Sequence, residues 1–235
     1  MLKNEGIVGV FVNYKKDTDM KYINIIKDIL NKNSVEHRLV NDVGENLSDI
    51  KLLIVLGGDG TILGVVRRIS DLSIPLFNVN IGTLGFLSEV EINEFCIMNE
   101  DRQKMVHVSV YINGDKAGKF DADGILVSTP TGASAYSLSA GGPIVYPNTN
   151  CLLITPVCAH SIAARPIVVN ADDTITVKSD NGDVILATDW QKQKLYGEEN
   201  EIKIKKSTKT VKFYKLNEHG FFDRMREKLI YNISR

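Results

Sequence analysis

A glycine-rich pentapeptide, Gly57-Gly58-Asp59-Gly60-Thr61, places the strongest constraint on how this chain can fold. It follows an apolar run, residues 52–56, that predicts a buried strand. It precedes residues 62–69, whose apolar positions have near-helical spacing. A strand, a glycine turn and a helix in that order direct backbone N–H groups and the positive end of the helix dipole at one point. The sequence therefore predicts a phosphate site at this turn.

Two known phosphate-binding motifs do not describe this turn. No Gly-Lys-Ser/Thr follows it, so it is not a P-loop, and no G-x-G-x-x-G dinucleotide motif is present. A plain strand-to-helix turn that uses glycine for positive φ is the structural alternative, but such a turn needs fewer glycines than three around an aspartate. Beside phosphates, the Asp59 carboxylate would either help to hold Mg²⁺ or accept the proton of a hydroxyl group. Both roles fit the sequence.

Composition narrows the class of protein. The chain has 235 residues, 43% of them hydrophobic, which is enough for two modest domains or one large one. Its formal net charge of −1 provides no global field that would favour nucleic acid or anionic membranes. The three cysteines form no C-x-x-C motif, which favours a reducing compartment. Because no apolar run approaches the roughly 20 residues of a membrane span, and no signal peptide is evident, we expect a cytoplasmic protein.

The chain changes character along its length. Its first third alternates strands and helices, which predicts a parallel sheet with ligands at the carboxyl ends of its strands. From residue 106 onward short β runs dominate, with hairpin turns expected at 113–114 and 180–183. Residues 201–206 and 210–216 are expected to form a last hairpin, and its lysines indicate a solvated edge rather than a nucleic-acid site. We expect an α/β domain over residues 1–93, a β-rich domain over 94–218, and a helix over 219–235 that packs back on the first domain.

A second cluster of unusual composition follows Asp123-Gly124. Residues 128–143 are dense in glycine, alanine, serine and threonine, and they include Tyr136. Small residues let a ligand approach the backbone, hydroxyl groups suit ribose and phosphate oxygens, and a tyrosine ring can stack. A flexible Ser/Gly linker is the alternative, but the flanking strands are too apolar for one. The stretch therefore predicts a second binding segment.

Taken together, these motifs resemble the NAD kinases. The matching blocks are 57–61, 80–87, 123–124 with 128–143, and 155–161 with 165–169, in the order in which the family has them. The glycine turn alone is a weak signal, since diacylglycerol kinases and phosphofructokinases carry similar loops, whereas the combination is specific. The resemblance implies a Rossmann-like N-terminal α/β domain, a C-terminal β-sandwich-like domain, and transfer of the ATP γ-phosphate to the 2′-hydroxyl of the adenosine ribose of NAD. It also implies an active site between the domains.

The resemblance assigns roles to individual residues. Asp59 would be the catalytic residue, and Gly57, Gly58, Gly60 and Thr61 would cradle phosphates. The residues expected near NAD are Asn80, Phe86, Asn99, Glu100, Asp123, Thr131, Ser134, Ala135, Tyr136, Ser139 and Asp189. Of these, Asn99-Glu100 is taken as the family's Asn-Glu pair for ribose and adenine. His160 matches a histidine that is either structural or a ligand contact.

The resemblance also implies partners and shows departures. Mg²⁺ would arrive with ATP, because no His or Cys residues have metal-ligand spacing, and the family forms homodimers or homotetramers. Several tens of residues are missing before Asn99-Glu100, the strand after that pair is reduced to 101–103, and Ala133 and Trp190 replace a common Ser and Gly. These departures keep open an NAD(P)-binding protein without kinase activity. A lipid or sugar kinase is disfavoured by the Tyr136 and His160/Arg165 blocks.

Overall fold

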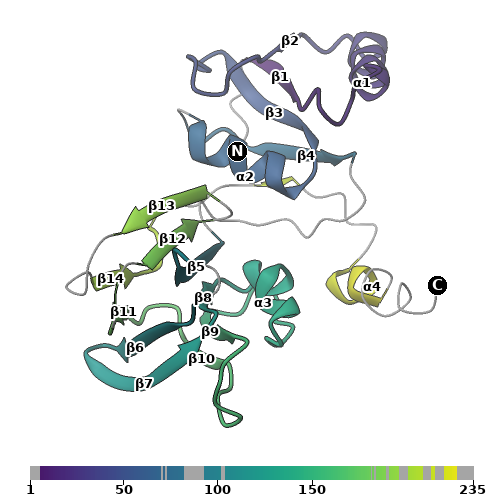
Figure 1. Ribbon diagram of the computed structural model, residues 1–235. Helices are drawn as coiled ribbons and strands as arrows, with labels where there is room; N and C mark the ends of the chain where they lie inside the picture. Colours follow the sequence, from purple (N-terminus) through teal and green to yellow (C-terminus); the bar gives the residue numbers. More distant parts are fainter. Residues whose placement is uncertain are drawn as a thin grey trace. The chain divides into compact units, whose positions relative to one another are not determined.

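The computed structural model describes residues 6–69, 71, 73–81, 93–101, 104–180, 182, 184–188, 191–195, 201–208, 213–214 and 220–226, without the side chains of residues 59, 80, 191–195, 214 and 224. The chain divides into two compact units (Figure 1). The first comprises Met1–Glu91 with Lys209–Arg235, and the second comprises Ile92–Thr208.

The first unit is built on a parallel sheet of five strands in the order β15-β4-β3-β1-β2. These strands are β1 (Ile7–Val12), β2 (His37–Leu39), β3 (Ile50–Gly57), β4 (Leu76–Asn80) and β15 (Phe213–Tyr214). Every pairing among them is parallel, which confirms the predicted α/β architecture. The register places the carboxyl ends of β1, β3 and β4 at one edge of the sheet, where α/β proteins bind ligands.

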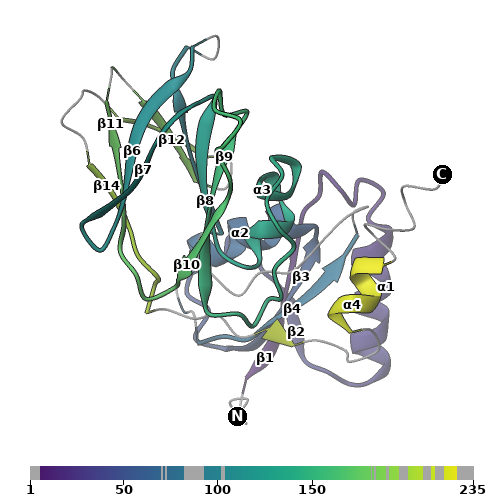
Figure 2. The same ribbon diagram turned by 90° about the horizontal axis from the view of Figure 1, so that it is seen from below.

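Helices α1 (Lys21–Lys32) and α2 (Asp59–Arg68) cover opposite faces of this sheet (Figure 2). The unit therefore has three layers, with the sheet between the two helices. Strand β3 contributes to the packing on both sides, because successive side chains of a strand point to opposite faces. Ile54 and Leu56 join the cluster of α1, whereas Leu53 and Val55 join the cluster of α2. The short helix α4 (Phe221–Met225) belongs to the same unit.

The second unit is a sandwich of two antiparallel sheets, as the β-sandwich-like expectation requires. One sheet has the order β10-β9-β8-β5-β12-β13 and the other β14-β11-β6-β7. Their bounds are β5 (Glu94–Asn99), β6 (Val106–Ile112), β7 (Asp115–Ala122), β8 (Gly124–Ser128), β9 (Cys151–Val157), β10 (Ile167–Asn170), β11 (Ile175–Ser179), β12 (Val184–Thr188), β13 (Gln191–Leu195) and β14 (Glu201–Ile204). One apolar core fills the space between the sheets, with Ile97, Ile125 and Ile154 from the larger sheet and Val108 and Val177 from the smaller.

Two expected hairpins do not form, although the Asn113-Gly114 hairpin is confirmed between β6 and β7. The described parts of 201–206 and 210–216, strands β14 and β15, do not pair with each other, because β14 pairs with β11 in the second unit and β15 extends the parallel sheet beside β4 in the first. β11 and β12, the strands on either side of residues 180–183, lie in different sheets and therefore do not form a hairpin. A turn motif indicates a reversal of the chain, but burial of the strands decides which partner each one takes.

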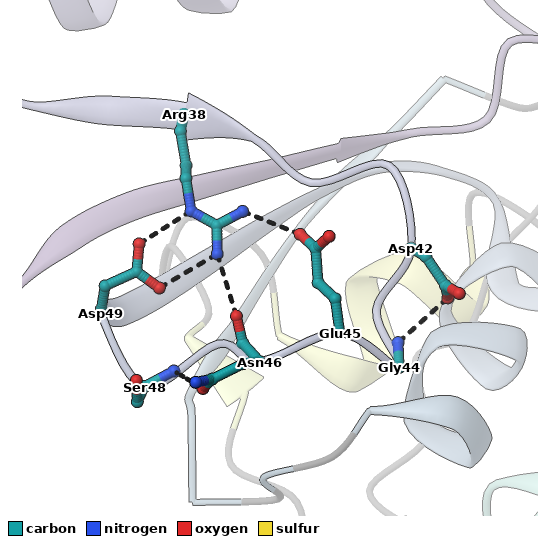
Figure 3. Close-up of polar contacts among 7 residues, drawn as sticks. All are labelled: Arg38, Asp42, Gly44, Glu45, Asn46, Ser48 and Asp49. Atoms are coloured by element: carbon teal, nitrogen blue, oxygen red, sulfur yellow. Dashed lines mark hydrogen bonds and ion pairs between the residues drawn. The ribbon is translucent and has the colours of Figure 1, made fainter.

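A network around Arg38 holds the connection from β2 to β3 (Figure 3). The Arg38 guanidinium donates to both carboxylate oxygens of Asp49, at 2.8 and 3.0 Å, and to a Glu45 carboxylate oxygen at 2.8 Å. It also donates to the Asn46 carbonyl at 3.2 Å. Hydrogen bonding to Arg38 lowers the pKa of Asp49, and the same bonds raise the pKa of Arg38. The network closes an eleven-residue span between Arg38 and Asp49.

We expect Arg38→Gln to lower the thermal unfolding midpoint by a few degrees at neutral pH, because a bidentate pair is lost and two carboxylates lose their cation. A carboxyl group whose pKa is lowered by folding stabilises the native state above its unfolded pKa, 3.8 for Asp49, and loses that contribution as the pH falls through its folded pKa. The difference between wild type and variant should therefore shrink below about pH 4. Calorimetry from pH 7 to 3 measures it, with Lys27→Gln as the charge-matched control; a difference that is constant with pH would contradict the assignment.

Candidate active site

The glycine turn lies at the carboxyl edge of the sheet in the first unit. Gly57 ends β3, Gly58 is the N-cap residue of α2, and Asp59 is the first residue of that helix. The N–H groups of Thr61 and Ile62 both donate to the Gly58 carbonyl, at 2.9 and 3.2 Å, which closes the first turn of the helix. A strand, a glycine turn and a helix N-terminus therefore follow one another as the sequence predicts.

The glycines of this turn serve close approach rather than positive φ. None of Gly57, Gly58 and Gly60 has a positive φ, so the plain-turn explanation does not account for them. A Cβ atom on Gly57 would lie 2.5 Å from both the Cβ and Oγ1 atoms of Thr61, so no side chain fits there. A Cβ atom on Gly60 would meet nothing within 4 Å, which leaves the backbone of the turn open on that side. On the Gly60 side, the backbone of the turn is therefore accessible to an anion.

Asn80 lies beside this turn. It is the last residue of β4 and is in register with Gly57, and the N–H of Ile81 donates to the Gly57 carbonyl at 3.3 Å. The backbone therefore brings two of the predicted segments, 57–61 and the start of 80–87, to the same edge. The side chains of Asp59 and Asn80 and the whole of Phe86 lie outside the described residues.

The Tyr136 segment covers the outer face of the larger sheet in the second unit. It forms a short 3₁₀ turn, η1 (Gly132–Ser134), and the helix α3 (Tyr136–Ser139), which lies against β8 (Figure 1). Tyr136 packs on Cys96 and Leu126, side chains that point away from the sandwich core. Burial raises the pKa of Tyr136, and the nearby Cys96, Cys158, Asp123 and Glu94 raise it further, so the phenol keeps its proton at neutral pH.

Buried polar groups of the sheet anchor this segment. The Ser137 N–H donates to a Glu94 carboxylate oxygen at 3.1 Å, and the Ser137 hydroxyl lies 2.8 Å from the Thr155 hydroxyl. All three residues are buried. Glu94 begins β5 and is in register with Ser128 at the end of β8, so the contact joins the helix to the centre of the sheet. Such a fully buried set of hydrogen bonds fixes the position of the residues around it.

Glycines allow the segment to pack this closely. A Cβ atom on Gly132 would lie 2.2 Å from the Asn93 carbonyl oxygen, and one on Gly142 would lie 2.4 Å from the Ser137 hydroxyl oxygen. The Thr131 carbonyl accepts the Ser134 hydroxyl at 2.9 Å. The small residues that the sequence singles out are therefore needed for packing as well as for access.

The structure brings a different Asn-Glu pair to this segment from the one that the sequence suggests. Asn99 is engaged in the turn after β5, where its side chain donates to the Met105 carbonyl at 3.3 Å and accepts the Asp101 N–H at 2.9 Å. Asn93-Glu94 instead lies directly against the Tyr136 segment. The Asn93 carbonyl accepts the Thr129 N–H at 2.9 Å, and its side-chain oxygen lies 3.3 Å from the Thr129 hydroxyl.

Recognition of β5 would have identified this pair. Residues 94–99 alternate imperfectly and were not expected as a strand, yet β5 lies in the middle of the larger sheet between β8 and β12. With the pair at 93–94, a six-residue strand begins at Glu94 itself, so the strand associated with the pair is not reduced.

The other predicted residues differ in exposure. Asp123, Ala135 and Ser139 are exposed, and Thr131 and Ser134 are half-buried. Asp123 immediately precedes β8, and its N–H donates to the Val157 carbonyl at 2.9 Å. The His160 N–H donates to the Asp121 carbonyl at 2.8 Å, and the residue is exposed. Asp189 and Trp190 lie outside the described residues.

The described part of the chain contains no cluster that could hold a metal ion by itself, because no three His, Cys, Asp or Glu side chains lie close together there. The three cysteines are free, with Cys96 and Cys151 buried and Cys158 exposed. Burial raises the pKa of the Cys96 thiol to about 12, so this thiol beneath Tyr136 is chemically inert.

No helix among the described residues is long and apolar enough to cross a membrane.

A glycine turn at the carboxyl edge of a parallel sheet, followed in the chain by a β-sandwich with a close-packed segment of small residues, has the features expected of a nucleotide-dependent kinase. Two sequence profiles match the chain: the ATP-NAD kinase N-terminal domain over residues 27–101 and the ATP-NAD kinase C-terminal domain over residues 92–216. This chain therefore belongs to the NAD kinase family.

Individual relatives agree with this assignment. The NAD kinase of Clostridium beijerinckii is 32% identical, with 96% of each chain covered, and that of Caldicellulosiruptor bescii is 33% identical, with 94% of this chain and 98% of the relative covered. An NAD kinase from Archaeoglobus fulgidus, solved in complex with ATP, has the same fold, with a TM-score of 0.77, 24% identity and coverage of 96% of this chain and 97% of its own. Yeast NADH kinase complexed with NADH has a TM-score of 0.76 at 21% identity, over 97% of this chain and 89% of its own.

The comparison with Clostridium beijerinckii also bears on length. The alignment has 272 positions, which exceeds the 235 residues of this chain, so the relative contains residues that this chain lacks. This chain is therefore shorter than the relative, as expected, and the expected place of the shortening, before Asn99-Glu100, stays a prediction.

Proposed function

We propose that this chain uses ATP to phosphorylate NAD at the 2′-hydroxyl of its adenosine ribose, which yields NADP and ADP. The observation that carries the proposal is that both NAD kinase profiles match in order and together span residues 27–216. The proposal is supported by two candidate ligand segments. One is the open glycine turn at 57–61, and the other is the anchored Tyr136 segment.

The chemistry requires one bond to form and one to break. The 2′-oxygen attacks the γ-phosphorus, the bond from that phosphorus to the β,γ-bridging oxygen breaks, and ADP leaves. The hydroxyl proton passes to a base, for which Asp59 at the start of α2 is the candidate. The N–H groups of the glycine turn would stabilise the negative charge of the phosphates. Phosphoryl transfer depends mainly on this alignment and charge stabilisation.

The acceptor would be held by the second unit. We assign the ribose to the Asn-Glu pair Asn93-Glu94, because its contacts with Thr129 and Ser137 place it directly against the Tyr136 segment. Asn99-Glu100 remains the alternative, and Asn99 is already engaged in a turn. Tyr136, with its proton retained, offers both a ring face and a hydroxyl group to the dinucleotide.

Mg²⁺ fits the residues present. Asp59, the first residue of α2, belongs to the turn proposed for phosphates, and an aspartate at that position suits a metal that is held mainly by triphosphate oxygens, as is usual for Mg²⁺ in kinases. Such an ion would neutralise charge on the transferred phosphoryl group.

We further propose that the protein is cytoplasmic, in line with its free cysteines, and that it forms a homodimer or homotetramer, the oligomeric states that are usual in the family.

One assay tests the function. The purified chain is incubated with NAD, ATP and Mg²⁺, and NADP is measured with an NADP-specific dehydrogenase. NADP formation that depends on all three additions is the expected result. Binding of NAD and ATP without formation of NADP would instead establish a dinucleotide-binding protein that lacks kinase activity, and phosphorylation of diacylglycerol but not of NAD would overturn the assignment of the acceptor.

A further inference from the structure

Asn13, a residue outside every motif above, is bonded to the glycine turn. It follows β1, and its N–H donates to the Leu56 carbonyl at 3.0 Å, one residue before the turn. Its side-chain Nδ2 lies 2.9 Å from the Thr61 Oγ1, although the two residues are 48 positions apart. Because β1 and β3 are neighbours in the sheet, the carboxyl end of β1 lies beside the glycine turn that is proposed to bind phosphate.

The direction of this hydrogen bond is determined by the other end of the Asn13 amide. Its Oδ1 accepts the backbone N–H of Lys15 at 3.1 Å, and a backbone N–H can only donate. The oxygen of the amide is thereby assigned, so the group that faces Thr61 is the NH₂. An NH₂ group only donates, and the Thr61 hydroxyl oxygen must therefore be the acceptor.

The Thr61 hydroxyl still has its own proton to donate. Within the described part of the chain, no acceptor takes that proton. Thr61 is half-buried in the first turn of α2, and its Oγ1 lies over the Gly57 backbone, where a Cβ atom would approach to 2.5 Å. The first N–H groups of any helix have no acceptor within the helix. The Thr61 hydroxyl proton therefore lies close to other hydrogen-bond donors, an arrangement that favours binding of an anion.

Positive charge lies near the same edge. Lys15 and Lys16 lie two and three residues after Asn13 and are exposed, and neither makes an ion pair with the residues that the structure describes. The Asn13 carbonyl accepts the N–H groups of Lys16 and Asp17, at 2.8 and 3.2 Å, so the residue that contacts Thr61 also shapes this turn.

We propose that Asn13 is a positioning residue of the phosphate site: it holds the Thr61 hydroxyl as an acceptor on the protein side, so that the hydroxyl proton is donated to a phosphate oxygen of the nucleoside triphosphate. This inference rests on the proposed function for the identity of the ligand. Asn13 itself does not touch the reacting atoms, and it acts through Thr61.

The test replaces the NH₂ group by an oxygen. In Asn13→Asp the carboxylate can only accept, so the Thr61 hydroxyl turns its proton toward residue 13 and away from the phosphate. A hydrogen bond to a charged group corresponds to roughly a 10- to 100-fold change in binding. We expect KM for ATP and Kd for a non-hydrolysable ATP analogue to rise by about that factor, with KM for NAD nearly unchanged. Asn31→Asp, on the exposed surface of α1, adds the same charge and should change neither constant.

A double-mutant cycle keeps the proposal testable if Asn13→Asp does not fold. Asn13→Ala and Thr61→Val are compared singly and together, with analogue binding as the measurement. If Asn13 acts through Thr61, Asn13→Ala should weaken binding in wild type but have little further effect beside Thr61→Val. Additive effects, or a folded Asn13→Asp with wild-type affinity for the analogue, would overturn the proposal. Because analogue binding needs no acceptor, a failure of the NAD kinase assay is distinguishable from a failure of this inference.

Discussion

Asp59→Asn should lower kcat by about 10²- to 10⁴-fold while the affinity for NAD stays within about twofold of wild type. The expected loss is this large because an amide can neither accept the hydroxyl proton nor hold Mg²⁺ as a carboxylate does. Affinity should persist because most of the residues proposed for NAD belong to the second unit, and Asp59 is assigned to the hydroxyl proton and Mg²⁺ rather than to NAD binding. Steady-state kinetics together with equilibrium binding of NAD measure both quantities.

The same variant distinguishes the two roles of Asp59. If the carboxylate is the base, the acidic limb of the pH profile should disappear and added Mg²⁺ should not restore activity. If the carboxylate mainly holds Mg²⁺, high Mg²⁺ concentrations should restore part of it. Asp28→Asn, an exposed carboxylate of α1, is the matched control and should be neutral. A near-normal rate in Asp59→Asn would reject the catalytic assignment.

Gly132→Ala should disrupt the Tyr136 segment and lower both stability and NAD affinity. The added Cβ atom would lie 2.2 Å from the Asn93 carbonyl oxygen and 2.9 Å from its carbon, and backbone atoms cannot move aside as a side chain can. Overpacking of this kind costs about 1–3 kcal/mol of folding free energy, and a clash with backbone belongs at the upper end. Denaturant unfolding and NAD binding measure the two effects.

Gly64→Ala is the control for this substitution. A Cβ atom on Gly64 would meet nothing within 4 Å, and the residue lies inside α2, where alanine is favoured over glycine by about 1 kcal/mol. It should therefore be neutral or stabilising. Wild-type stability and NAD affinity in Gly132→Ala would show that the Tyr136 segment is not positioned through its contact with Asn93.

Periodicity and turn chemistry were sufficient to predict most of the elements. The βα rhythm of the first third predicted the parallel sheet, alternation predicted β6, and the short apolar run at 125–128 predicted β8. Strand β5 was missed because it is buried on both faces in the middle of a sheet and lacks clear alternation. The consequence was functional, since Asn93-Glu94 lies at its start.

By itself, the sequence determined the local units of this protein, namely the strand, glycine turn and helix around Asp59 and the small-residue segment around Tyr136. These depend on residue types within a few positions of one another, so they can be read directly from the chain. Only the tertiary structure decided that β15 joins β4 rather than β14, that Glu94 lies beneath Ser137, and that Asn13 bonds to Thr61. Those contacts join residues that are 43 to 137 positions apart in the sequence. Burial and hydrogen-bond satisfaction select the partners, and no local sequence pattern contains that information.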